Sequence, residues 1–287
     1  MRLVFLGTPA AAVPPLRALV DNGHEVALVV SRADKRRGRG GELTPSAVKI
    51  AALELGLPVT SKVDDVIETG ADLGVVVAFG LIIKPHVLAA VPMVNLHFSL
   101  LPRWRGAAPV ERAILAGDEE TGVCVMEVEE GLDTGGVYAL ERVAIRPHEH
   151  LDELRARLVE VGTRLLVETL ARPGGLGSPE PQVGEPTYAS KLTPEELQMD
   201  WSRPAEYLAR LPQVGRAWTT FRDKRLLILD ARPVPAGPAP GLLDHVVVGT
   251  GEGGLELVTV QPEGRAPLDA AAWRNGARPG PDERLGG

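Results

Sequence analysis

The sequence predicts an α/β protein with a mainly parallel sheet, followed by a small β-barrel domain. Three observations lead to this expectation. Short apolar runs alternate with amphipathic helical patterns over the first half of the chain, as in repeated βαβ units. A stretch rich in proline and glycine interrupts that pattern at residues 172–187. Beyond it, short β-type runs separated by turn residues replace the long helices.

The first half is expected to alternate strands and helices. The apolar runs that predict its strands are 2–6, 25–30, 58–59, 72–78 and 94–100. A helical spacing of apolar residues after Pro9 predicts the first helix. Thr44 and Pro45 predict the start of the next, with the threonine as N-cap and the proline at the first position. The basic, glycine-rich stretch 32–42 before it is expected to be a loop.

The next part should add an antiparallel pair, at 121–129 and 137–145, and one long amphipathic helix at 151–170. A short helix near 203–210 and β-type runs at 218–221, 226–229, 245–248 and 255–260 should follow. The glycine- and proline-rich tail after Asn275 is expected to be frayed. The sequence therefore predicts a first domain at 1–171, a linker at 172–187 and a second domain at 188–287.

Bulk properties are typical of a globular enzyme without disulfides. The 287 residues are 44% hydrophobic and 24% charged. The single cysteine, Cys124, lies in an apolar run that predicts a buried thiol. No apolar run is long enough for a signal peptide or a membrane span, so the cytoplasm is the expected location. The net charge of −7 argues against a general nucleic-acid binder, although residues 32–39 are locally basic.

A row of polar residues marks the run 94–100. In a strand, Asn95, His97 and Ser99 share one face, and they lie near the strand's carboxyl end. Open α/β sheets bind ligands at that end. From this window alone, an ordinary polar strand end is an open alternative.

Glu130–Gly136 forms a second polar cluster. Glycines on both sides of Asp133 allow tight turns and a close approach of the backbone to a ligand. A plain β-turn is the alternative for this window. The six histidines show no spacing typical of a zinc site, so no metal is expected.

Together these segments resemble the folate-dependent formyltransferase family. The resemblance is carried by Asn95-x-His97-x-Ser99-Leu-Leu-Pro-x-Trp-Arg-Gly-Ala-Ala-Pro109, and by the stretches 113–118, 121–123 and 131–135. Shorter matches lie at 7–9, 38–40, 43–46, 77–82, 188–192, 200–202 and 261–264. The ordered match runs from the first residue to about residue 270. It implies a Rossmann-like formyltransferase domain and an OB-like C-terminal barrel.

The resemblance also implies the chemistry and the residues that perform it. A formyl group would pass from 10-formyltetrahydrofolate to an amine, with Asn95, His97 and Asp133 as catalytic residues. The amide and the imidazole can donate hydrogen bonds to the formyl oxygen as it gains charge, and the carboxylate can orient the imidazole and help take the amine's proton. The implied folate-binding residues are Ala78, Phe79, Gly80, Leu81, Ile82, Ser99, Leu100 and Pro102.

Within the family, the chain is most similar to members that formylate initiator methionyl-tRNA for translation initiation. The resemblance then implies substrate-binding roles for the cations that could meet tRNA phosphates, namely Arg36, Arg37, Arg39 and Lys191. The segment 211–218 departs from those members, which usually carry an Asn-Pro-Trp-Pro type of sequence there. One alternative is a formyltransferase for a sugar-nucleotide amine or another small amine. Another is a non-catalytic paralogue that binds folate or RNA. The protein is expected to be a monomer.

Overall fold

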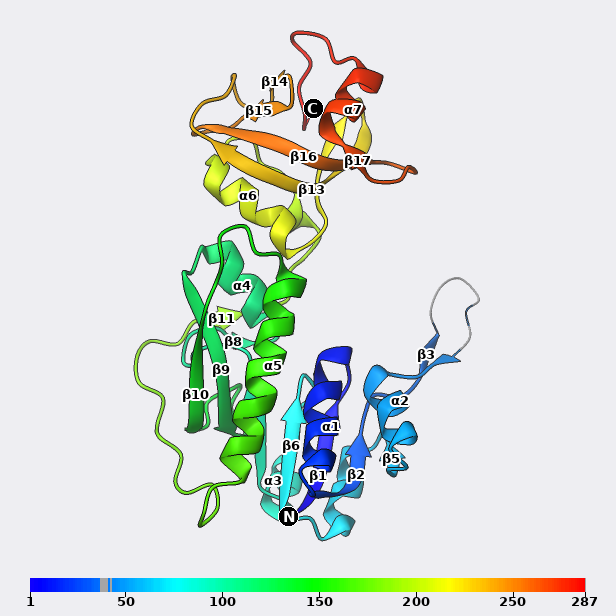
Figure 1. Cartoon of the computed structure of the whole chain (residues 1–287), viewed down its shortest axis with the longest axis vertical. Coiled ribbons are helices and arrows are strands. Elements are labelled where there is room, and N and C mark those ends of the chain that lie inside the picture. Colours follow the sequence, from blue (N-terminus) through cyan, green and yellow to red (C-terminus); the bar gives the residue numbers. More distant parts are fainter. Residues whose placement is uncertain (37–40, 42, 287) are drawn as a thin grey trace. The chain divides into compact units, whose positions relative to one another are not determined.

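The computed structural model describes residues 1–36, 41 and 43–286 (Figure 1). The chain divides into two compact units. The first contains Met1–Val110, Glu120–Ala144 and Leu154–Ser190, and the second contains Glu111–Glu119, Ile145–Glu153 and Lys191–Gly287.

A seven-stranded sheet forms the centre of the first unit, in the order β10-β9-β7-β6-β1-β2-β5. Its strands are β1 (Arg2–Gly7), β2 (Glu25–Val30), β5 (Val59–Thr60), β6 (Leu73–Val77), β7 (Met93–His97), β9 (Glu120–Glu127) and β10 (Val137–Ala144). The pairs from β5 to β7 are parallel, whereas β9 and β10 are antiparallel to their neighbours. The predicted mainly parallel α/β sheet is confirmed, and so is its late antiparallel pair.

Helices follow the strands as the βαβ pattern requires. They are α1 (Val13–Asp21), α2 (Ala47–Glu54), α3 (Pro85–Ala90), α4 (Pro109–Ala116) and α5 (Leu151–Leu170), with short 3-10 turns at Ala10–Ala12 and Val63–Thr69. The long helix has the predicted bounds and packs on β7 and β9, because a Cβ on Gly162 would lie 2.9 Å from Val123 Cγ1 and 3.2 Å from Leu96 Cδ2. The predicted burial of Cys124 is confirmed. In the described part of the chain, no helix is both long and apolar enough to cross a bilayer.

Two predictions about residues 32–46 are wrong. The stretch expected to be a loop includes a short strand, because β3 (Lys35–Arg36) pairs antiparallel with β4 (Leu43–Thr44). The N-cap of α2 is Ser46 and not Thr44, since the Ser46 Oγ accepts a hydrogen bond of 3.0 Å from the Lys49 amide. The threonine is engaged in strand pairing instead.

An antiparallel sheet forms the second unit, in the order β12-β13-β16-β15-β14, with β17 paired to β16. The strands are β12 (Ala217–Phe221), β13 (Lys224–Val234), β14 (Leu243–Asp244), β15 (Val247–Gly249), β16 (Gly254–Pro262) and β17 (Leu268–Asp269). A 3-10 turn (Glu195–Leu197) and the helices α6 (Ala205–Val214) and α7 (Ala270–Ala277) accompany them. The predicted C-terminal β structure is confirmed.

Residues 276–286 are packed on the second unit and not frayed as predicted. Helix α7 continues to Ala277, and Leu285 is buried in the core of the second unit. The Leu285 amide donates to the Gly241 carbonyl at 2.9 Å. A glycine- and proline-rich composition led to the wrong expectation because it cannot show where one apolar residue near the end will pack.

Candidate active site

The carboxyl ends of three parallel strands lie side by side in the first sheet. In register, Gly7 of β1 is beside Val77 of β6, which is beside Leu96 of β7. The loops that leave these strands therefore begin at one edge, the edge at which open α/β sheets bind ligands. Two of the loops are in contact, since Thr8 Oγ1 lies 3.5 Å from the Phe79 carbonyl oxygen.

Strand β7 delivers two of the predicted catalytic residues to this edge. His97 is its last residue, and only 6% of its side chain is exposed. Asn95 lies two positions earlier and is half-buried. Among the residues that the structure describes, the Asn95 side chain has no hydrogen-bond partner. Its amide is thus free to bind a ligand.

The backbone around Trp104 fixes the imidazole of His97. The His97 Nε2 lies 3.0 Å from the Trp104 carbonyl oxygen. A carbonyl oxygen can only accept, so Nε2 carries the proton of that hydrogen bond. The other ring nitrogen, Nδ1, faces the Asp133 carboxylate at a distance of 3.7 Å from Oδ2. The structure thus brings the predicted pair together and assigns a partner to each nitrogen.

The backbone just after Trp104 also binds the side chain of Asp133. Its Oδ2 accepts a hydrogen bond of 2.7 Å from the Gly106 amide, and 15% of its side chain is exposed. The glycine at 135 allows the tight turn that follows, because a Cβ there would lie 2.1 Å from the Glu127 carbonyl oxygen. Residues 130–136 could therefore form a turn and also belong to a ligand site, since the turn directs the Asp133 carboxylate toward His97.

Left-handed backbone conformations gather at this edge. The φ angles are 47° at Ala78, 64° at Trp104 and 50° at Asp133, with glycines in the same region at Gly80 and Gly106. Such conformations are unfavourable for residues with a side chain and are concentrated at functional sites in proteins. They are observed here at the loops that follow β6 and β7 and at the Asp133 turn.

The residues predicted to bind folate fall into two groups. Leu81 and Ile82 are exposed, by 53% and 88%, as are Ala78 and Gly80, whereas the Phe79 side chain is buried in the core. Within the described residues, the backbone amides of Gly80, Leu81 and Ile82 donate to no protein acceptor. This loop therefore offers apolar surface and unused hydrogen-bond donors together.

The second group supports the loop after β7. Ser99 is fully buried, and its hydroxyl donates to the Arg103 carbonyl at 2.7 Å, which closes the turn. Ser99 lies beyond the end of β7, which stops at His97. The prediction that Ser99 and His97 share one face of a strand is therefore wrong. Leu100 packs on Gly122, where a Cβ would lie 2.4 Å from the leucine Cδ2. Pro102 is half-buried in the same turn.

Two residues of the predicted linker, Gln182 and Thr187, and the short strand that follows them contact the loops of this site. This strand, β11 (Tyr188–Ala189), pairs in parallel with β8 (Arg105–Gly106). The Thr187 hydroxyl accepts from the Trp104 amide at 2.9 Å. Gln182 makes hydrogen bonds to both loops of the site. No sequence signal marked this glutamine, because it lies among prolines and glycines without any periodicity.

The predicted acceptor-binding residues are placed only in part. Arg36 is exposed in β3, and Lys191 is exposed in the second unit. Arg37 and Arg39 lie outside the described residues. In the described part of the chain, no three His, Cys, Asp or Glu side chains gather where they could hold a metal ion, so the expected lack of a metal stays a prediction.

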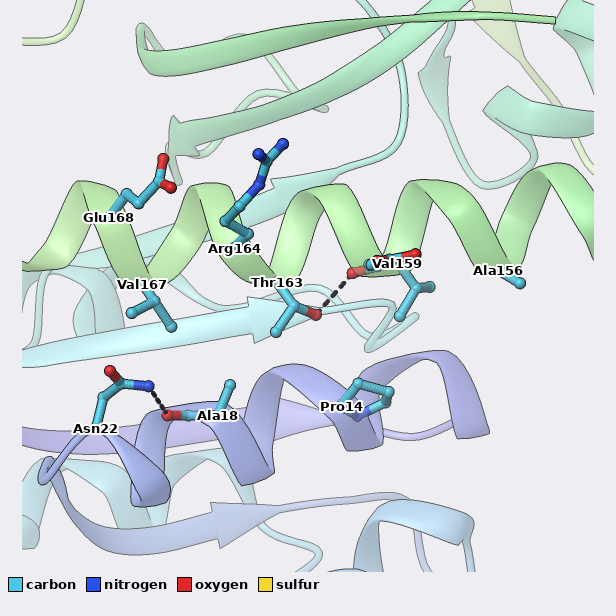
Figure 2. A pocket seen from close by; sticks show the side chains of 10 residues that line it. Pro14, Ala18, Asn22, Ala156, Val159, Thr163, Arg164, Val167 and Glu168 are labelled. Carbon is cyan, nitrogen blue, oxygen red and sulfur yellow. Dashed lines mark hydrogen bonds between the residues drawn. The ribbon is translucent and has the colours of Figure 1, made fainter.

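A groove of about 580 Å³ lies between α1 and α5 (Figure 2). Three of its polar side chains have partners in the protein, since Thr163 Oγ1 donates to the Val159 carbonyl, Asn22 Nδ2 to the Ala18 carbonyl and Arg164 Nη2 to the Glu141 carboxylate. None of the predicted site residues lines it. The groove is therefore separate from the chemistry at the strand ends.

Sequence comparison covers both parts of the chain. The model of the formyl transferase family matches residues 1–170, and that of the formyl transferase C-terminal domain matches residues 191–278. The methionyl-tRNA formyltransferase of Methylobacterium sp. (strain 4-46) is 44% identical, over 99% of this chain and 99% of that one. The chain belongs to the methionyl-tRNA formyltransferase family. The relative of the same name from Roseobacter denitrificans is 45% identical over 96% of each chain.

Solved structures share the fold of this methionyl-tRNA formyltransferase family member. The methionyl-tRNA formyltransferase from Clostridium thermocellum matches with a TM-score of 0.59 at 16% identity, over 81% of this chain and 93% of that one. The N-formyltransferase from Helicobacter canadensis, solved in complex with folinic acid and dTDP-3-aminofucose, matches with a TM-score of 0.67 at 14% identity, over 91% and 98%. At such identities the likeness concerns the fold alone.

Proposed function

We propose that the chain transfers the formyl group of 10-formyltetrahydrofolate to the α-amino group of initiator methionyl-tRNA. The observation that carries this proposal is the 44% identity, over 99% of each chain, with a methionyl-tRNA formyltransferase. The convergence of Asn95, His97 and Asp133 at the carboxyl edge of the sheet supports it.

The donor has a suitable place beside those three residues. When bound, 10-formyltetrahydrofolate supplies the formyl group. The loop 78–82 is suited to its flat ring, because exposed Leu81 and Ile82 offer apolar surface and free backbone amides offer donors to the ring's edge. Ser99, Leu100 and Pro102 would act by shaping the adjoining turn, since the serine hydroxyl is already engaged with Arg103.

Asn95 is the proposed donor to the formyl oxygen. That oxygen gains negative charge as the amine attacks the formyl carbon. The Asn95 amide has no protein partner to give up within the described residues, so it can donate without reorganisation. One such donor is worth roughly 100- to 1000-fold in rate.

His97 and Asp133 are the proposed acid–base pair. The attacking α-amino group must be neutral, and such groups titrate near ~8. As its nitrogen bonds to the formyl carbon, it becomes positively charged and must lose a proton. The Asp133 carboxylate and the His97 Nδ1 lie 3.7 Å apart and can accept that proton. The same pair can return it to the folate nitrogen as the bond between that nitrogen and the formyl carbon breaks, so the carrier leaves as tetrahydrofolate with that nitrogen neutral. The Nε2 hydrogen bond to Trp104 holds the ring in place meanwhile.

The acceptor would be held by basic side chains. We propose Arg36, Arg37, Arg39 and Lys191 as contacts to tRNA phosphates, supported for Arg36 and Lys191 by their exposure. We also propose a catalytic domain at 1–171, a linker at 172–187 and an OB-like domain at 188–287, supported by the two family matches. The proposed working state is a monomer in the cytoplasm.

A formyl-transfer assay tests the proposal. Purified protein is incubated with 10-formyltetrahydrofolate and charged initiator tRNA, and the amino acid is released and analysed. The proposal expects formylmethionine in amounts that grow with enzyme and time, and none when the donor is omitted. Methionine that stays unmodified with active donor present would overturn it.

A further inference from the structure

Gln182 connects the two loops of the candidate active site. Its Nε2 donates to the carbonyl oxygens of Asp133 and Gly135, at 2.8 Å each. Its Oε1 accepts from Arg105, at 2.6 Å from Nη2 and 3.1 Å from Nε. A primary amide has two donor hydrogens and two acceptor lone pairs, so these four contacts use its full capacity. A side chain so completely engaged is built into the site.

The hydrogen bonds of Gln182 connect the main chain of Asp133 to the loop that binds the Asp133 carboxylate. The Arg105 side chain that binds the glutamine belongs to the residue before Gly106, whose amide donates to the Asp133 Oδ2 at 2.7 Å. The glutamine therefore binds the main chain of Asp133 directly. It also binds Arg105, and the loop of Arg105 and Gly106 binds the Asp133 carboxylate. Asp133 has a φ of 50°, a left-handed conformation that aspartate adopts at a higher cost than glycine, although more readily than most other residues, so support of its main chain helps to keep the turn in place.

We propose that Gln182 is a positioning residue, which keeps the Asp133 carboxylate in place beside the Nδ1 of His97. This inference rests on the proposed function, and it gives a part in catalysis to a segment that the sequence presents as a linker. The glutamine acts through Asp133 and does not itself meet the reacting atoms. A displacement of a reacting group by about 1 Å can cost on the order of 100-fold in rate.

The segment around Gln182 has its own anchors, so the side chain can be changed without releasing the chain. On one side, Glu180 and Val137 exchange backbone hydrogen bonds of 2.8 and 2.9 Å. On the other side, β11 pairs with β8. Loss of the glutamine amide should therefore loosen the Asp133 turn while the fold persists.

The test uses Gln182→Met, which keeps the length of the side chain and removes all four hydrogen bonds. We expect kcat for formyl transfer to fall about 10- to 100-fold, with KM for both substrates within about twofold of wild type. Gln182→Glu keeps an acceptor for Arg105 but has no donor for the two carbonyls, so it should also lose kcat. The matched control is Val183→Met, at a neighbouring side chain that is 87% exposed, and it should keep wild-type kinetics.

A double-mutant cycle separates positioning from general stability. If Gln182 acts through Asp133, then Gln182→Met added to Asp133→Asn should lower kcat by less than about twofold further. A role limited to stability would give the same fold-loss in both backgrounds. Wild-type kcat in Gln182→Met, or an undiminished loss in the Asp133→Asn background, would overturn the inference.

Hydrogen exchange gives a readout that does not depend on the reaction. The Gly106 amide donates to the Asp133 carboxylate, so it should exchange at least tenfold faster in Gln182→Met and remain unchanged in Val183→Met. If the Gly106 amide exchanges faster in Gln182→Met but the wild-type protein formylates no methionyl-tRNA, the proposed function is wrong and the positioning contact is still supported. Unchanged exchange would contradict the positioning contact itself, whatever the activity.

Discussion

At the residue scale, the three proposed catalytic side chains differ in how firmly the protein holds them. His97 is buried and bound to the Trp104 carbonyl through Nε2, and Asp133 is bound to the Gly106 amide. Asn95 is half-buried and has no side-chain partner among the described residues. This arrangement fits the proposed roles, in which the pair transfers a proton and the amide binds the formyl oxygen.

Replacing each of these residues by alanine should lower kcat by about 100-fold or more, because each change removes a transition-state contact. Asn95→Ala should be the least disruptive to the fold, since its amide supports no other group. Steady-state kinetics and thermal unfolding of the three variants check both points. Rates near wild type in all three variants would show that the site has been assigned wrongly.

Burial raises the pKa of the Cys124 thiol from 9.0 to about 11, although a backbone hydrogen bond near Leu101 opposes the shift. Below about pH 9 the thiol is neutral in both the folded and the unfolded chain, and its full contribution to stability is present. As pH rises from about 9 to about 11, the unfolded chain ionises first, so the free energy of unfolding falls.

The comparison with Cys124→Ala isolates this contribution. The difference in unfolding free energy between wild type and variant should shrink across that pH window. In addition, the native thiol should react slowly with an aromatic disulfide reagent at pH 8 and rapidly in denaturant. A difference between the two proteins that does not change with pH, or fast labelling of the folded protein, would contradict the burial.

At this scale the sequence predicted where side chains in regular structure lie. Strand alternation put Asn95 and His97 on one face, and flanking glycines predicted a turn at Asp133, whereas the catalytic roles of all three were implied only by the family resemblance. Gln182 was not predictable, since its partners are main-chain carbonyls and an arginine brought near only by the fold. Ser99 was predicted as a ligand contact, but its hydroxyl donates to the Arg103 carbonyl within the turn.

At the scale of elements, the site depends on the short parallel pair formed by β8 and β11. Gly106 in β8 has a φ of 119°, and a Cβ there would lie 2.9 Å from the Ala189 carbonyl oxygen. Its amide is also the donor to Asp133. This one position thus combines a backbone conformation that favours glycine, strand pairing and the contact to the proposed catalytic carboxylate.

Gly106→Ala should therefore reduce both stability and activity. We expect a loss of about 2–3 kcal/mol in the free energy of unfolding, from the strained φ and the clash together. Gly177→Ala is the matched control, because its φ is 72° but nothing lies within 4 Å of the added Cβ. It should lose about 1 kcal/mol from the φ alone. Urea unfolding measures both losses. Equal losses in the two variants would show that the clash with the Ala189 carbonyl oxygen does not contribute.

Helices were predictable where the spacing of apolar residues continues over many turns. The helix at 151–170 was predictable because its apolar period continues over the whole segment. The start of α2 was not, because Thr44 and Ser46 are both good N-cap residues within three positions. Pairing of β4 with β3, which is a tertiary effect, decided between them.

At the scale of the whole molecule, the parallel sheet was predictable from the alternation of strands and helices. In the second unit the strand content was predictable, but the strand order was not, because short strands carry little information on their partners. The burial of Leu285 illustrates the same limit, since only the assembled core of that unit gives it a place.

The proposed tRNA contacts predict a strong dependence on salt. Affinity for initiator tRNA should fall steeply between low and moderate salt, as each phosphate contact releases counterions. Arg36→Ala should reduce the slope by about one counterion, because the exposed guanidinium is removed, and folate affinity should stay unchanged. Arg36→Lys keeps the charge and should keep the slope. Binding isotherms at several salt concentrations decide, and identical slopes for wild type and Arg36→Ala would exclude a phosphate contact at this residue.

The proposed function depends most on the acceptor of the formyl group, which we propose is methionyl-tRNA. The most direct test measures kcat/KM for initiator methionyl-tRNA and, under the same conditions, for a sugar nucleotide that bears a free amine. We expect a ratio of at least about 100 in favour of the tRNA, since a sugar nucleotide has only its own diphosphate and lacks the extended phosphate backbone that the basic side chains would contact. Efficient formylation of the sugar nucleotide, beside tRNA that stays unformylated, would contradict it.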